Sequence, residues 1–178
     1  GIPYRTIPGT HPEKGAYFTR GTSHDENARY TEDGEIHARV LGRLAKKFRT
    51  AATLVPKPEI TISSSGANTA IIYFGSTRPA VLEALDQMAS DGLSVNAMRL
   101  RAFPFSEEVI EFCNNHDQVL VVEQNRDAQM RALLMTEAAI SGEKLIPVLN
   151  IDGYPLTADF VANALKEHAG AAKVAAAE

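Results

Sequence analysis

The sequence contains a single cysteine, Cys113, and no tryptophan. One thiol cannot form an internal disulfide, a thiolate-rich zinc site or an iron–sulfur cluster, because each of these needs several cysteines. Scarce cysteine is also typical of the reducing cytoplasm, where we expect this chain to reside. No apolar run approaches the roughly 20 residues that span a bilayer, so we expect no membrane partner.

An excess of basic residues is also lacking. The 178 residues include 18 lysines and arginines against 22 aspartates and glutamates, for a net charge of −4. Proteins that bind nucleic acid usually carry a basic excess or a basic face, so we expect no nucleic-acid partner. The five histidines have no metal-ligand spacing, and the glycine motifs of dinucleotide-binding, P-loop and serine-hydrolase proteins are missing.

The composition changes near Pro56, and this change divides the chain. Residues 1–34 are polar and rich in glycine and proline, whereas apolar side chains in 35–52 recur with helical spacing. We therefore expect an irregular arm, one helix and a short linker before a compact domain. The predicted segments are 1–57 for arm, helix and linker, 58–170 for the domain, and 171–178 for a frayed alanine-rich tail.

Strand and helix patterns alternate through the predicted domain. Apolar runs typical of buried strands occur at 70–75, 93–100, 118–123 and 144–149, and amphipathic segments follow them. This alternation predicts an α/β fold with a mostly parallel, doubly wound sheet and helices on both faces. Pro147 cannot donate to a neighbouring strand, which favours an edge position or a strand end for the last run.

Ligands of doubly wound sheets usually bind at the carboxyl ends of the strands. One such loop is Gly75-Ser76-Thr77, which could hold an anion or nucleotide at a helix N-terminus beside Arg78. A free-standing α/β module that binds such a ligand is therefore one interpretation. Simple helix capping is the more common role of a turn of this kind.

A second loop, Glu123-Gln-Asn-Arg-Asp, is richer in charge. Glu123 and Asp127 could form a general acid/base pair, but no nucleophile or third orienting group accompanies them. We favour an ion-pair and capping cluster that contacts a neighbouring domain or subunit. Either Asn125 or Asp127 is expected to open the following helix.

The arm holds the densest set of polar groups, Phe18-Thr-Arg-Gly-Thr-Ser-His-Asp-Glu. Arg20, with Thr19 or Thr22, could hold a carboxylate through two parallel hydrogen bonds. A polar surface loop is an equally good interpretation of these residues.

Several long stretches resemble one family of enzymes. They are GIPYRTIPGTHPEKGAYFTRGTSHDE, ARYTEDGEIH, AMRLRAFPFSEEV, VVEQNRDAQMRALL and KLIPVLNIDGYPLT. They resemble the C-terminal part of the α subunit of 2-oxoacid:ferredoxin oxidoreductases, in its 2-oxoglutarate branch. The resemblance implies that the α/β domain is similar to the transketolase C-terminal domain and serves packing and subunit contact. It also implies that the arm ends a domain that binds the pyrimidine side of thiamine diphosphate.

Enzymes of this family decarboxylate a 2-oxoacid on thiamine diphosphate, pass electrons through iron–sulfur clusters to ferredoxin, and release acyl-CoA. The sequence lacks the G-D-G…N signature for the diphosphate and Mg²⁺, because Ile151-Asp-Gly has neither its context nor its asparagine. The resemblance therefore implies a fragment that is inactive alone and binds no cofactor itself. Thiamine diphosphate, Mg²⁺ and clusters would belong to upstream α-subunit domains and a separate β subunit, with ferredoxin and coenzyme A as further partners.

The resemblance also suggests roles for particular residues. Arg20 matches the region from which the family contacts the substrate carboxylate, with Thr22 and His24 as secondary candidates. Asn27 departs from the aromatic residue expected there. Four residues in and just after the charged loop would face coenzyme A or, as we prefer, a subunit boundary: Glu123, Asn125, Arg126 and Arg131.

Overall fold

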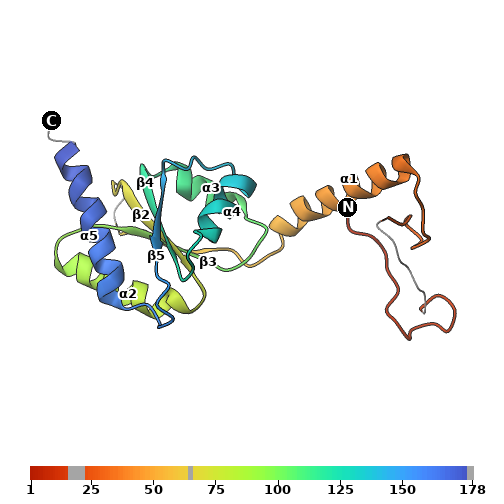
Figure 1. The fold of residues 1–178 in the computed structure, drawn as a ribbon, viewed down its shortest axis with the longest axis horizontal. Coiled ribbons are helices and arrows are strands. Elements are labelled where there is room, and N and C mark those ends of the chain that lie inside the picture. The colour runs from red at the N-terminus through yellow and green to blue at the C-terminus, as the bar shows by residue number, and fades with distance from the viewer. Residues whose placement is uncertain (16–22, 64–65, 176–178) are drawn as a thin grey trace. The chain divides into compact units, whose positions relative to one another are not determined.

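The structure is a computed structural model that describes residues 1–15, 23–63 and 66–175 (Figure 1). The chain divides into two compact units, Gly1–Leu54 and Val55–Glu178. None of the described helices has the length and hydrophobicity needed to cross a membrane.

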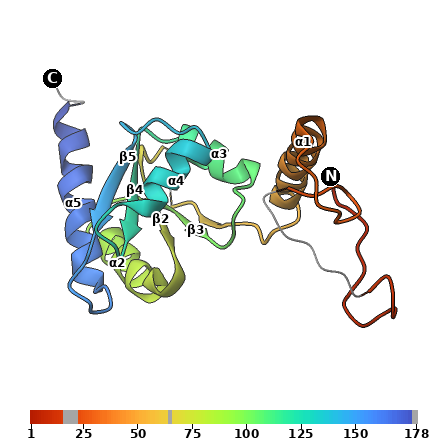
Figure 2. The same ribbon diagram turned by 45° about the vertical axis from the view of Figure 1, so that its right-hand side comes forward.

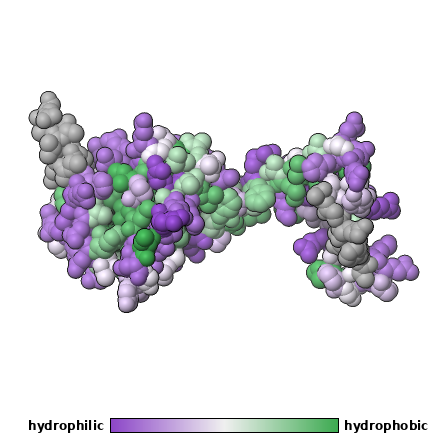
Figure 3. Space-filling view, in the orientation of Figure 1, coloured by the Kyte–Doolittle hydropathy of each residue, from purple (hydrophilic) through white to green (hydrophobic). Residues whose placement is uncertain are grey.

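The described residues of the first unit, 1–15 and 23–54, form irregular chain and one helix, α1 (Gly34–Ala52). The helix begins at Asp33, whose carboxylate accepts hydrogen bonds from the backbone N–H groups of Glu35 (2.8 Å) and Ile36 (3.0 Å). The predicted helix is therefore confirmed. None of its residues is buried, and Leu41 and Phe48 are half exposed, so hydrophobic groups reach the surface along α1 (Figure 3).

The part of the second unit that the structure describes is a five-stranded sheet with four α-helices. Its strands are β1 (Glu59–Thr61), β2 (Thr69–Phe74), β3 (Asn96–Leu100), β4 (Gln118–Glu123) and β5 (Leu145–Leu149). Its helices are α2 (Arg78–Ser90), α3 (Glu107–Asn114), α4 (Gln129–Glu137) and α5 (Ala158–Ala175), with a short 3₁₀ turn, Gly75–Thr77, before α2.

The strands lie in the order β1-β3-β2-β4-β5, and all neighbours are parallel except β1, which runs antiparallel to β3. The predicted α/β class with a mostly parallel sheet is confirmed. The last strand, which contains Pro147, does lie at an edge. Strand β1 at the other edge was not predicted, because its three exposed residues form no apolar run.

The helices cover both faces of the sheet, α2 and α5 on one and α3 and α4 on the other (Figure 2). Alternate residues of each central strand point to opposite faces. Ile71 of β2 packs in the cluster with α2 and α5, whereas its neighbour Ile72 packs with α3 and α4, and both are fully buried. The two hydrophobic layers fix the positions of the loops at the carboxyl ends of the strands.

Candidate functional site

The loops after β2 and β4 diverge at the carboxyl edge of the sheet. These strands are neighbours, but the chain passes from β2 to α2 on one face and from β4 to α4 on the other. Such a divergence is where doubly wound sheets usually form a ligand crevice. The turn Gly75–Thr77 and the loop Glu123–Asp127, both singled out in the sequence, border this point.

Glu123 lies at the end of β4 and is completely buried. Its carboxylate accepts three hydrogen bonds, from the backbone N–H groups of Met130 (2.7 Å) and Arg131 (2.9 Å) and from the Asn125 amide (2.7 Å). The carboxylate thus satisfies two N–H groups in the first turn of α4 and meets the positive end of the helix dipole. A carboxylate this fully enclosed has no surface with which to contact coenzyme A or a partner.

Asn125 completes the start of α4. Its side-chain oxygen accepts hydrogen bonds from the backbone N–H groups of Asp127 (3.1 Å) and Gln129 (3.2 Å). Ala128, the residue before the helix, has a left-handed conformation with φ of 50° and no capping side chain of its own. Asn125 therefore caps the helix as predicted, but from a turn four residues before Gln129, the first residue of α4. Glu123 accepts from the next two N–H groups, those of Met130 and Arg131.

The two arginines of the corner have different surroundings. The Arg131 guanidinium donates to the carbonyls of Leu145 (2.7 Å) and Gly142 (2.9 Å), and so ties α4 to the start of β5. Arg126 is 79% exposed and forms an ion pair with Asp127 at 2.7 Å. Of the four residues predicted for this site, Arg126 is the one whose charge is presented to solvent.

No acid/base pair is formed at this corner. Asp127 pairs with Arg126 on the surface, whereas the Glu123 oxygens already accept bonds from three donors inside the domain. The geometry is that of a structural corner with one exposed cation, which agrees with the capping cluster favoured from the sequence.

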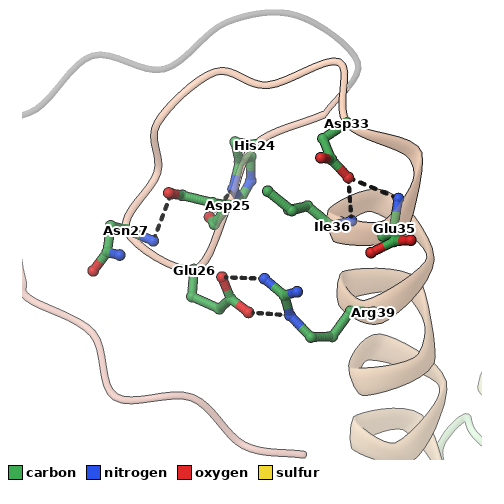
Figure 4. Close-up of polar contacts among 8 residues, drawn as sticks. All are labelled: His24, Asp25, Glu26, Asn27, Asp33, Glu35, Ile36 and Arg39. Carbon is green, nitrogen blue, oxygen red and sulfur yellow. Dashed lines mark hydrogen bonds and ion pairs between the residues drawn. The ribbon is translucent and has the colours of Figure 1, made fainter.

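In the first unit, the segment around His24 is held by hydrogen bonds to itself and to α1 (Figure 4). His24 is exposed, and its Nδ1 donates to the carbonyl of Asp25 at 2.8 Å. The Asp25 carboxylate in turn accepts from the backbone N–H groups of Asn27 (2.8 Å) and Arg29 (2.9 Å). These bonds close a tight turn, and Arg20 and Thr22 lie outside the described residues.

One ion pair attaches this turn to α1. Arg39 donates from Nε and Nη2 to the two carboxylate oxygens of Glu26, at 2.7 and 3.1 Å (Figure 4). The Arg39 guanidinium lowers the pKa of Glu26 to about 2, chiefly through this hydrogen bond. The same turn borders an open hollow of about 640 Å³ within the first unit, lined by Tyr4, Arg5, Lys14, Glu26 and Arg29 among others.

The described residues do not assemble a metal site. No group of three or more histidine, cysteine, aspartate or glutamate side chains comes together within residues 1–15, 23–63 and 66–175. Asp152, in the Ile151-Asp-Gly segment, accepts a hydrogen bond from the Tyr154 backbone in a turn (2.9 Å).

Comparison with known proteins relates the chain to one enzyme family. The α subunit of 2-oxoacid:ferredoxin oxidoreductase 2 from Aeropyrum pernix is 30% identical over 150 residues, 82% of this chain and 23% of that subunit. The chain is homologous to part of this α subunit. The corresponding subunit from Saccharolobus solfataricus is 25% identical over the same share of each chain. The chain matches no family model.

A solved structure extends the relationship to the three-dimensional level. The 2-oxoglutarate:ferredoxin oxidoreductase from Magnetococcus marinus, with 2-oxoglutarate, coenzyme A and succinyl-CoA bound, superposes with a TM-score of 0.78 and 25% identity. The match covers 91% of this chain and 28% of that one. The chain thus spans about a quarter of the length of the relatives it matches.

Proposed function

We propose that this chain acts within the α subunit of a 2-oxoacid:ferredoxin oxidoreductase of the 2-oxoglutarate type, corresponding to its C-terminal part. The enzyme would convert the 2-oxoacid and coenzyme A to acyl-CoA and pass the electrons to ferredoxin. The observation that carries this proposal is the match over 91% of the chain to an enzyme with 2-oxoglutarate and coenzyme A bound. A cytoplasmic location is in keeping with the single, buried and unpaired Cys113.

Within that enzyme we assign this chain to packing and subunit contact. The support comes from its surface: α1 has an apolar stripe without a buried residue, and Arg126 presents an exposed charge at the carboxyl edge of the sheet. A helix that is hydrophobic on one side gains most of its stability by packing that side against another element. Thiamine diphosphate, Mg²⁺ and the iron–sulfur clusters would be held by other α-subunit domains and a β subunit.

The test is to purify the chain with its natural partners and assay the complex. A tagged chain expressed in its native cells should bring down a β subunit and should support coenzyme A-dependent reduction of ferredoxin. The rate with 2-oxoglutarate should exceed that with pyruvate or a branched 2-oxoacid. A preparation without a partner subunit, or without 2-oxoacid-dependent reduction, would contradict the proposal.

We further propose that Arg20 binds the substrate carboxylate in the assembled enzyme, with Thr22 and His24 beside it. Replacing Arg20 by alanine should then lower kcat/KM for the 2-oxoacid. The decrease should correspond to roughly 2–4 kcal/mol of lost binding free energy, the range for a desolvated charge pair. The loss should appear mainly in KM. Arg29→Ala is a suitable control because it removes an exposed arginine from the same segment. Equal kcat/KM in the Arg20 variant and the native complex would exclude this role.

A further inference from the structure

Three arginines surround one glutamate at the edge of the sheet in the second unit. Glu59 of β1 lies opposite Arg99 of β3 in the strand register, and Arg99 lies opposite Tyr73 of β2. Residues opposite one another in a sheet point to the same face, so all three share the face that α2 and α5 cover. Arg101 follows two residues after Arg99, and Arg78 begins α2 at the same end of β2.

The single carboxylate does not saturate these guanidinium groups. Glu59 accepts hydrogen bonds of 3.3 and 3.4 Å from Nη1 of Arg99, whereas Nε of Arg101 (3.6 Å) and of Arg78 (3.9 Å) make only longer ion pairs. The Nε of Arg99 is buried and has no hydrogen-bond acceptor among the described residues. Buried donors are rarely left without an acceptor, so an additional oxygen is expected here.

The local charge indicates what kind of group would supply that oxygen. Three cations and one anion leave a net charge of +2. No acidic residue occurs in β2, in β3 or in the first turn of α2, all of which the structure describes. A phosphate monoester carries a charge of about −1.5 to −2 near neutral pH, whereas a second carboxylate would supply only −1. Guanidinium groups also match phosphate oxygens through paired, parallel hydrogen bonds.

We propose that Arg78, Arg99 and Arg101 form a binding site for a phosphate group. The side chains of Arg78 and Arg101 are 48% and 43% exposed, which leaves room for a ligand from solvent. Glu59 competes with the phosphate group for the arginines. This site is independent of the function proposed above.

The site is tested by calorimetric titration of the 178-residue chain with inorganic phosphate, pyrophosphate and glycerol phosphate. The ionic strength is kept constant with chloride. Arg78→Gln and Arg101→Gln should each weaken binding about ten- to thirtyfold, as expected for one positive charge about 4 Å from a phosphate charge of −1.5 to −2 in a solvent-exposed setting. Glu59→Gln should tighten binding by a similar factor, because it removes the competing carboxylate. Binding of glycerol phosphate together with these effects identifies a phosphate monoester as the ligand class.

Lys166→Gln is the matched control, because it removes one exposed positive charge from another surface ion pair of the same unit. It should leave the affinity unchanged. The proposal is overturned if none of the three phosphates binds, if the double Arg78→Gln, Arg101→Gln variant binds as the native chain does, or if Glu59→Gln fails to tighten binding. Tighter binding of an oligoglutamate peptide than of pyrophosphate would also overturn it, in favour of an acidic protein partner.

Discussion

Glu123 offers a sharp test of how the α4 corner is built. Replacing this buried glutamate by glutamine keeps the shape of the side chain but turns one acceptor oxygen into an NH₂ donor. Whichever way the amide is turned, that donor faces at least one of the groups that now donate to the carboxylate: Met130 N–H, Arg131 N–H and the Asn125 amide. At least one strong hydrogen bond is therefore lost, and a buried donor is left without an acceptor.

The expected cost follows from these bonds. A hydrogen bond to a charged group contributes about 1.5–3 kcal/mol, and an unsatisfied buried donor costs a similar amount. Glu123→Gln should therefore lower the free energy of unfolding by about 2–4 kcal/mol. Glu123→Ala should cost still more because all three bonds are lost and a cavity remains. Since domains of this size are stable by about 5–15 kcal/mol, the glutamine variant should remain folded and measurable.

Urea unfolding monitored by circular dichroism provides the measurement, with Asp127→Asn as the control. Asp127 lies in the same loop, is 55% exposed and makes only a surface ion pair, so its replacement should cost less than about 1 kcal/mol. If Glu123→Gln were no more destabilising than Asp127→Asn, the capping role assigned to the buried carboxylate would be refuted.

Two further predictions concern titrating groups. The pKa of Glu26 is depressed to about 2 by Arg39, so the ion pair should stabilise the folded first unit above about pH 4.5 and lose this effect as the pH falls toward 2. In an NMR titration the carboxyl carbon of Glu26 should show a midpoint near 2 that rises toward 4.5 in Arg39→Ala, because the largest cause of the lowered pKa is removed; an unchanged midpoint would contradict this cause. Burial raises the pKa of Cys113 to about 11, so its thiol should react with a disulfide reagent at neutral pH only after denaturant is added. Rapid reaction of the native chain would contradict this prediction, because it would show that α3, which contains Cys113, opens readily.

Much of the fold could be predicted because its elements carry strong local patterns. The run Gln118–Glu123 is apolar at four successive positions, and the observed strand has the predicted bounds. The amphipathic spacing in residues 35–52 likewise predicted α1 to within one residue. Strand β1 has no such pattern: it is three exposed residues long, and only its pairing with β3 makes it a strand.

The candidate functional residues were likewise predicted only in part. The sequence identified the polar groups of the loop after β4, and Asn125 was correctly expected to help open α4. It gave no sign that Glu123 would be turned inward, because that depends on α4 being placed over the end of β4. The sequence also did not indicate the arginine cluster, since Arg78 and Arg99 are far apart in the chain and meet only at the edge of the folded sheet.

The sequence by itself therefore determined the α/β class, the bounds of elements such as α1 and β4, and the relationship to 2-oxoacid:ferredoxin oxidoreductases, because these depend on hydrophobic period and on long shared stretches. Tertiary structure alone decided which charges are available. It buries Glu123 beneath a helix start, leaves Arg126 in solvent and gathers three arginines around Glu59. The physical reason is that the solvation and the partners of a charge depend on side chains brought from other elements, which local sequence does not specify.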